Sequence, residues 1–317
     1  MHKKVAIISV FLGKLPRWMP NFLITIGQNR EFTFLLFTAQ DLSAGYSYID
    51  ENIVHNKLTI CQFNALATRK LGFKVSLAFP YKICDFKPAM GVVFEDFLED
   101  YDFWGYCDMD MVFGNIGNFI TGNILRDHDV ISTYHGFLSG PFCLFRNNHT
   151  TKTLFSTIPR YENILRYPAN LGFDENIARP EHWGFSIHKF LMFVAFLFKP
   201  RHIRPPLFPF PEFRYQFQWY YKKCRLKQHE PHDMTEAVWK AHNENRLRIY
   251  HKELVISSEY LRRTGRRHWK YIKKPAGLFD LIAKKEIFAF HFRASQLTIG
   301  NETELNARPD ENWMITE

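Results

Sequence analysis

A strand–helix–strand pattern near the start of the chain most constrains the fold. Residues Val5–Phe11 are apolar and largely β-branched, and they end just before Gly13, as a buried strand does. A helix is predicted over residues 18–27 and a second apolar strand over residues 32–37. Two strands joined by a helix at this spacing predict a βαβ unit. They therefore predict a parallel sheet that binds ligands beyond the carboxyl ends of its strands.

The rest of the chain continues this alternation and then changes character. Further helices are predicted over residues 64–71 and 88–98, and further strands over residues 103–108, 130–132, 142–146, 245–257 and 286–292. From about residue 150 the sequence becomes helical and basic, and the five prolines within residues 200–211 exclude regular structure there. These elements predict an α/β fold with helices flanking a sheet.

Composition excludes some classes of protein and indicates an anionic partner. With 46% hydrophobic residues the chain can bury a core, which excludes disorder of the whole chain. Residues 1–150 carry 13 basic and 14 acidic side chains, whereas the remaining residues carry 28 and 18. The net charge of +9 therefore comes from the second half, which suits phosphate, nucleic acid or acidic lipid.

Cysteines and apolar runs indicate the compartment. The five cysteines are scattered, and no pair has the spacing of zinc ligands, which favours a reducing compartment. The first apolar run is only about eight residues long and lacks a small-residue cleavage site, so it indicates a strand and not a secretory leader. The later apolar run, residues 190–198, is too short to span a membrane. We expect a cytoplasmic protein.

The sharpest local signal is a pair of aspartates, Asp108 and Asp110, that follows an apolar strand. Two carboxylates in an Asp-x-Asp turn can hold Mg²⁺ or Mn²⁺ and leave coordination positions open for substrate phosphates. The alternative is a solvated acidic turn. Because apolar sequence lies on both sides of the pair, carboxylates without a function would be costly here, and we favour the metal site.

A cation lies directly before the predicted helix 88–98. Lys87 precedes Pro88, and Asp85 lies two residues before Lys87. The charge of Lys87 and the free N–H groups of a helix start can together bind a negatively charged ligand. In the alternative interpretation Lys87 is exposed and Asp85 caps the helix.

Several ordered motifs resemble the nucleotide-sugar glycosyltransferases of the GT-A fold. More narrowly, they resemble a bacterial family of polysaccharide glycosyltransferases long described as of unknown function. The motifs are residues 11–16, 34–38, 81–91, 104–115 and 139–147. The resemblance covers about residues 5–180 and returns near residues 285–297. It implies a GT-A-like (Rossmann-like) fold with a mixed, mostly parallel sheet, a divalent metal cofactor (Mn²⁺ or Mg²⁺) and a nucleotide-sugar donor.

The same resemblance implies a division of the chain and a reaction. Residues 1–200 would form the catalytic domain, with a nucleotide-sugar half to about residue 115 and an acceptor half from about residue 116. Residues 201–317 would form a basic, aromatic-rich extension. The implied reaction is inverting, metal-dependent transfer of a sugar to a saccharide acceptor in surface polysaccharide or lipopolysaccharide (O-antigen) synthesis. UDP-sugars are the expected donors, and some relatives are thought to transfer galactofuranose.

The resemblance also assigns the metal and donor residues. Asp108 is expected to reach the donor ribose or the metal, and Asp110 to ligate the metal. His291, between aromatic residues, is the candidate third ligand, with a core histidine as the alternative. The sequence after His291 departs from the family's pattern. The expected donor contacts are Asp108, Gly13, Asp41, Asp85 and Lys87, with ordinary turn roles as the alternative for Gly13 and Asp41.

Inverting transfer needs a carboxylate base beside the acceptor and away from the metal. Asp174 is the first choice for this base and Glu175 the second; alternatively, both simply open a helix. Ser139, Gly140 and Trp183 are expected to shape the acceptor site, with Trp183 stacking on a sugar ring.

Two basic stretches rich in aromatic residues, 201–227 and 262–274, favour contact with an anionic membrane surface. A lipid-linked glycan acceptor would place the enzyme at the inner face of the cytoplasmic membrane. Three alternatives stay open. First, the two stretches could be solvated surface. Second, the chain could bind nucleic acid, although it carries no fold signature for this and we expect none to bind. Third, it could be a nucleotide-sugar hydrolase or phosphotransferase.

Overall fold

A computed structural model of the chain describes residues 3–16, 18–42, 49–134, 138–168, 170–175, 231, 233–257, 270–274, 277–280, 284–291 and 313–316. Its centre is a sheet of seven strands in the order β3-β2-β1-β4-β7-β6-β8. In chain order these are β1 (Val5–Phe11), β2 (Thr33–Thr38), β3 (Ile53–Lys57), β4 (Phe103–Cys107), β6 (Val130–Ser132), β7 (Phe142–Arg146) and β8 (Ile249–His251).

The sheet is mixed and mostly parallel. Strands β3, β2, β1 and β4 pair in parallel, as the βαβ pattern predicts, and β6 pairs in parallel with β8. Only β7 is antiparallel to both of its neighbours, β4 and β6. The predicted fold class, a mixed and mostly parallel sheet flanked by helices, is therefore confirmed.

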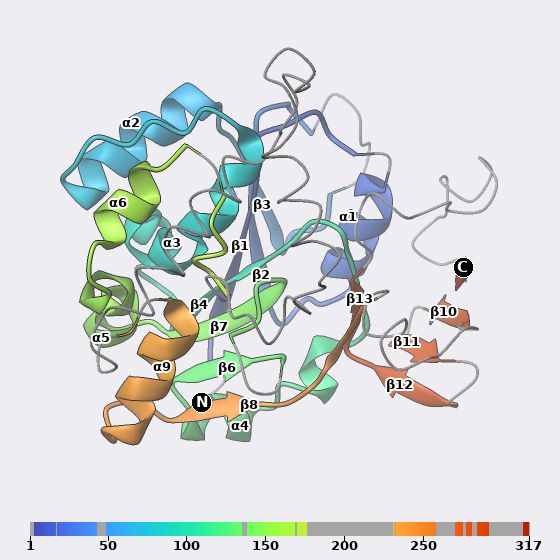
Figure 1. Cartoon of the computed structure of the whole chain (residues 1–317). Coiled ribbons are helices and arrows are strands. Elements are labelled where there is room, and N and C mark those ends of the chain that lie inside the picture. The colour runs from blue at the N-terminus through green and yellow to red at the C-terminus, as the bar shows by residue number, and fades with distance from the viewer. Residues whose placement is uncertain are drawn as a thin grey trace, which may run out of the picture.

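Helices cover both faces of this sheet (Figure 1). One face carries α2 (Ile60–Leu71), α3 (Met90–Val93), α5 (His149–Lys152), α6 (Tyr161–Arg166) and α9 (Met234–Asn243), and the other carries α1 (Met19–Gly27) and α4 (Gly122–Asp127). Strand β1 shows why two cores form. Its alternating side chains send Ala6 and Ile8 into the first core and Val5 and Ile7 into the second.

Helix α2 shows how local sequence sets an element's limits. Thr59 caps its start, because the hydroxyl of Thr59 accepts the Gln62 N–H while the Gln62 side chain accepts the Thr59 N–H. Gly72 ends it in the left-handed conformation, at φ 75°. Phe63 and Ala67, four residues apart, are its buried residues.

Two smaller sheets come largely from the C-terminal part. A three-stranded sheet has the order β5-β13-β9, from β5 (Met111–Phe113), β9 (Val255–Ser257) and β13 (Ala289–His291). A four-stranded sheet has the order β12-β11-β10-β14, from β10 (Lys270–Lys274), β11 (Gly277–Asp280), β12 (Lys285–Ile287) and β14 (Trp313–Thr316). Strand β13 runs antiparallel to β5 with His291 opposite Met111, so late residues return to the segment that follows Asp110.

The structure corrects three predicted elements. No continuous helix covers residues 88–98: Pro80–Ala89 is a 3₁₀ segment, α3 is a single turn, and Glu95–Phe97 is again 3₁₀. The helical turn ends at Phe94, whose φ of −107° and ψ of 23° lie outside the helical region. The predicted strands 245–257 and 286–292 each divide in two, because their halves pair in different sheets. Among the described residues, no helix is long and apolar enough to cross a membrane.

Candidate active site

Asp108 lies at the carboxyl end of β4, directly after the buried strand. Two hydrogen bonds fix this position. The Ser9 hydroxyl donates to the Cys107 carbonyl at 2.9 Å, and the Asp108 N–H donates to the Pro141 carbonyl at 2.9 Å. Strand β5 begins at Met111, so Asp108 and Asp110 occupy the short turn between two strands.

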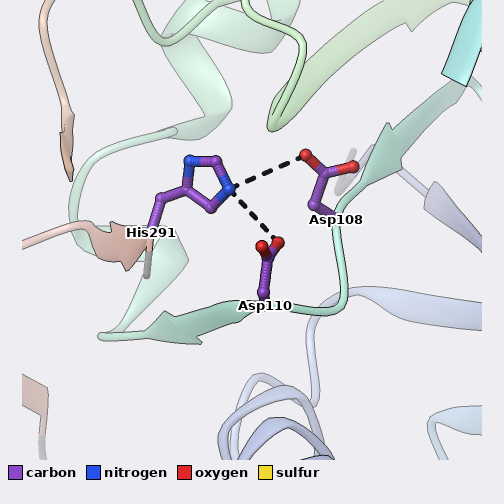
Figure 2. A group of neighbouring side chains, drawn as sticks. All are labelled: Asp108, Asp110 and His291. Carbon is purple, nitrogen blue, oxygen red and sulfur yellow. Dashed lines mark ion pairs between the residues drawn. The ribbon is translucent and has the colours of Figure 1, made fainter. Parts of the chain in front are cut away.

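His291 completes a group of three side chains with these aspartates (Figure 2). Its Nε2 atom lies 3.2 Å from Asp110 Oδ1 and 3.9 Å from Asp108 Oδ2. One ligand atom from each residue lies within 4.8 Å of the others. The pairing of β13 with β5 explains the contact, because it brings His291 beside the segment that carries Asp110. The structure thus brings together the three residues predicted as metal ligands.

The chemistry of this group fits a divalent cation. Two carboxylate oxygens and one imidazole nitrogen are ligands that such cations accept. The exposed fractions of the Asp108 and Asp110 side chains are 25% and 22%, so both carboxylates reach solvent, while His291 is 9% exposed. His291 is therefore nearly buried, as a core histidine would be, but its Nε2 faces two carboxylates. That nitrogen donates to a carboxylate when protonated and offers a lone pair to a metal when deprotonated.

Lys87 is a buried cation between two carboxylates, and not an exposed residue at a helix start. Its Nζ lies 2.7 Å from Asp108 Oδ1 and 3.2 Å from Asp174 Oδ2, and it donates to the Gly140 carbonyl at 2.9 Å. Burial opposes the charge, but Asp108, Cys84 and Asp174 outweigh it and raise the pKa of Lys87 well above its usual value. Lys87 is therefore an ammonium that holds one oxygen of Asp108.

Asp174 lies near Asp108, one of the three metal candidates. Both Asp174 and Asp108 contact the same ammonium of Lys87. Asp174 is buried, and this burial raises its pKa to about 7 despite the opposing effect of Lys87.

Glu175, the second candidate, is held against Gly140. Its Oε1 accepts the Gly140 N–H at 3.1 Å, and its backbone carbonyl accepts a hydrogen bond from the Thr235 hydroxyl. A Cβ atom at residue 140 would lie 2.3 Å from Glu175 Oε1, so this approach requires glycine.

Ser139, a predicted acceptor contact, makes its hydrogen bonds within the protein. Its side chain is fully buried, its hydroxyl lies 2.8 Å from that of Thr133, and its N–H donates to the Ser132 hydroxyl. Gly140 is likewise buried, with its N–H on Glu175 and its carbonyl on Lys87. Ser139 and Gly140, the predicted acceptor contacts, therefore lie in the wall behind the charged groups.

Asp85, a predicted donor contact, is fully buried and holds the segment that carries Asp174. One oxygen accepts the Phe173 N–H at 2.8 Å. The other accepts the Leu171 N–H at 2.8 Å and the Lys82 ammonium at 2.6 Å. Lys82 also donates to the Ile164 carbonyl.

Lys82 was missed at the sequence level. Its only signal is a lysine three residues before an aspartate in an aromatic-rich segment, a pattern that also occurs on exposed helix faces. In the structure the Lys82 side chain is buried together with Asp85.

The other predicted site residues are Gly13, Asp41 and Trp183. Gly13 is half-buried after β1, and Asp41 is exposed after β2, both beyond the carboxyl ends of parallel strands. Trp183 and the basic stretches 201–227 and 262–269 lie outside the described residues.

Comparison with known proteins gives a family and two remote likenesses in structure. A family model described as "Family of unknown function (DUF6625)" matches residues 7–192. No curated protein matches the sequence significantly.

Among solved structures, the galactosyltransferase LgtC in complex with donor and acceptor sugar analogues matches at 11% identity and a TM-score of 0.32. The match covers 51% of this chain and 66% of that enzyme, just under two thirds of its length. Mouse xyloside xylosyltransferase 1 in its apo form matches at 6% identity and a TM-score of 0.33, over 51% of this chain and 71% of that chain. Likenesses this remote establish no shared activity.

Proposed function

Since the chain belongs to DUF6625, a family of unknown function, we propose an activity from the site itself: metal-dependent transfer of a sugar from a nucleotide-sugar donor to a saccharide acceptor. The observation that carries this proposal is the group formed by Asp108, Asp110 and His291 at the carboxyl end of β4. These three residues would hold a divalent cation. When bound, such a cation neutralises the charge of a diphosphate leaving group.

The position of the group in the sheet supports a nucleotide donor. Strands β2, β1 and β4 are parallel neighbours, so Asp41, Gly13 and Asp108 follow strands that end at one edge of the sheet. Ligands of open α/β sheets bind beyond such an edge. Gly13 and Asp41 are therefore proposed donor contacts on the nucleoside side. The donor phosphates would lie between these residues and the metal.

The ligand set favours Mn²⁺ over Mg²⁺. Carboxylates suit both ions, whereas an imidazole nitrogen suits the softer transition metals better than Mg²⁺. Lys87 already neutralises part of the charge of Asp108, which leaves Asp108 Oδ2 directed toward His291 for the cation.

Asp174 is the proposed proton acceptor for the incoming hydroxyl. A carboxylate whose burial raises its pKa to about 7 is a stronger base than an exposed one, and its pKa lies near working pH. Glu175 is the second choice, because its Oε1 accepts the Gly140 N–H. A single carboxylate base would give inversion at the transferred sugar.

The finer parts of the proposal rest on the sequence. A UDP-sugar, with UDP-galactofuranose among the candidates, is the proposed donor. Synthesis of surface polysaccharide at the inner face of the cytoplasmic membrane is the proposed setting. The basic residues of 262–274 would attach the enzyme to anionic lipid.

The activity is tested by incubating the purified chain with UDP-, GDP- and CMP-sugars, with and without Mn²⁺. We expect one class of nucleotide-sugar to raise the melting temperature only when Mn²⁺ is present. We also expect slow, Mn²⁺-dependent hydrolysis of the donor, which releases the nucleotide. Asp110→Asn should show neither effect. A parent protein that binds none of these nucleotide-sugars in the presence of Mn²⁺ would remove the proposal.

A further inference from the structure

Two aromatic side chains are unusually exposed beside the site. The exposed fractions are 67% for Phe79 and 72% for Tyr81, the highest of the large apolar side chains that the structure describes. Neither ring packs against another aromatic ring among the described residues. Exposure of two neighbouring aromatic rings costs hydration free energy, and grouped exposed apolar surface commonly marks a binding site.

The same segment carries these rings and the buried charges of the site. Phe79 precedes the 3₁₀ segment Pro80–Ala89 and Tyr81 is its second residue; the segment then contributes Lys82, Asp85 and Lys87 to the interior. Residue 80 lies at the sheet edge: a Cβ atom on Gly13 would be 4.0 Å from the Pro80 Cβ. Phe79 and Tyr81 flank Pro80 in the chain, so both residues lie next to the end of β1.

Tyr81 also interacts electrostatically with groups inside the site. Cys84, burial, Asp174 and Asp108 all raise the pKa of its phenol. These groups act on its polar tip, while most of the side chain stays exposed. An aromatic face with hydrogen-bond acceptors at its edge is a common arrangement in ligand sites.

We infer that Phe79 and Tyr81 form a platform that stacks on a ring of the saccharide acceptor. The inference deepens the proposed function, on which it rests, by naming the surface that receives the acceptor. A sugar ring presents C–H groups on its faces and hydroxyl donors at its edge. Those hydroxyls complement the Asp174 carboxylate, which only accepts hydrogen bonds when ionised.

The test uses saccharide binding, so that it does not depend on transfer activity. Saturation-transfer NMR with the methyl glycosides of galactose, glucose and N-acetylglucosamine reports ring protons in contact with the protein. The variants are Phe79→Ala and Tyr81→Ala, with Tyr81→Phe and Phe79→Tyr as ring-preserving partners. Val54→Ala, which trims an exposed apolar side chain on β3, is the matched control.

We expect the parent to bind at least one glycoside and each alanine variant to lose about tenfold in affinity, equivalent to ~1.4 kcal/mol. The ring-preserving variants and Val54→Ala should bind as the parent does. Calorimetry with UDP and Mn²⁺ should give one affinity for all six proteins.

Three results would overturn the platform. In the first, both alanine variants still bind the glycosides as the parent does. In the second, the parent binds none of the three glycosides. In the third, the alanine variants lose affinity for UDP but keep their affinity for glycosides. The last result would assign the rings to the nucleobase. If the parent binds glycosides through these rings but binds no nucleotide-sugar, the platform stands and only the proposed function is refuted.

Discussion

Lys87 and Asp108 form an ion pair of 2.7 Å that joins the 3₁₀ segment Pro80–Ala89 to the end of β4. The same ammonium lies 3.2 Å from Asp174, so one buried cation serves two carboxylates. Removal of this cation would leave two negative charges close together with little solvent to screen them. Such a change is far more costly than loss of an exposed pair.

Lys87→Met should therefore lower the free energy of unfolding by about 3–5 kcal/mol. Adding Asp174→Asn removes one of the stranded charges, so the double variant should be more stable than the sum of the two single losses predicts. Urea denaturation of the parent, both single variants and the double variant measures this coupling. Strictly additive losses would mean that Lys87 and Asp174 do not interact in solution.

Two of the proposed metal ligands should differ in their effect on metal binding. Asp110→Asn should abolish measurable Mn²⁺ binding, because it removes a charged ligand and leaves one carboxylate. His291→Ala should weaken binding less, because it removes a neutral ligand. Isothermal calorimetry with Mn²⁺ alone compares them, and Asp96→Asn, an exposed carboxylate that pairs with Lys70, is the control. A His291→Ala variant that unfolds would instead indicate a core histidine.

Substitution of Asp85 should lower transfer activity and leave metal affinity unchanged. Asp85→Asn keeps the size of the side chain but weakens the acceptors of the Leu171 and Phe173 N–H groups, and it leaves Lys82 without its counter-charge. We expect at least about a tenfold fall in kcat, since small displacements of a reacting group are costly. Mn²⁺ affinity should stay at the parent value.

Two further measurements separate positioning by Asp85 from general damage. Pairing Asp85→Asn with Lys82→Met removes the unpaired buried charge, so stability should recover in part while kcat stays low. If kcat recovered together with stability, Asp85 would be only a folding residue.

Local sequence was enough for much of the fold. The apolar runs of β1, β6 and β7 were predicted with the limits that the structure shows, because continuous apolar runs are the direct signal of buried strands. Asp108 and Asp110 were found because two acids next to a buried strand are costly without a function. His291 came only from the family resemblance, since its contact depends on the pairing of β13 with β5.

The buried charges could not be predicted, for a physical reason. Lys82, Asp85 and Lys87 look like an exposed polar face in sequence, and their partners lie far along the chain. Asp85 accepts an N–H from a residue 86 positions away. Local propensity carries no information about such contacts, so the shared contact of Lys87 with Asp108 and Asp174 was not predicted.

Asp129 predicts how stability changes with pH. Its oxygens accept the Arg146 guanidinium at 2.7 Å and the Arg248 N–H at 2.9 Å, which ties β6 to β7 and β8. Burial opposes the charge, but these partners outweigh it and lower the pKa of Asp129. A lowered pKa stabilises the fold above the unfolded value of about 3.9, and this contribution is lost as pH falls through the lower folded value.

Asp129→Asn should thus cost about 1–2 kcal/mol at pH 7, and the difference from the parent should shrink as the pH approaches 3. Urea denaturation at several pH values measures it. Asp127→Asn, which removes an exposed pair with Arg126, is the matched control and should change little at any pH. A difference that stays constant with pH would mean that the charge of Asp129 contributes nothing.

The proposed base gives the most decisive test. Asp174→Asn keeps the shape of the side chain and removes the proton acceptor, so transfer should fall by about 10²–10⁴-fold while binding of UDP with Mn²⁺ persists. Glu175→Gln should be milder, because the amide oxygen can still accept the Gly140 N–H. Because Asp174 also pairs with Lys87, each variant needs its melting temperature measured beside its kcat. Asp174 would be only the counter-charge of Lys87 if Asp174→Asn slowed transfer no more than a few-fold. A product that retains the donor's anomeric configuration would exclude the inverting, single-base mechanism, whichever acid is involved.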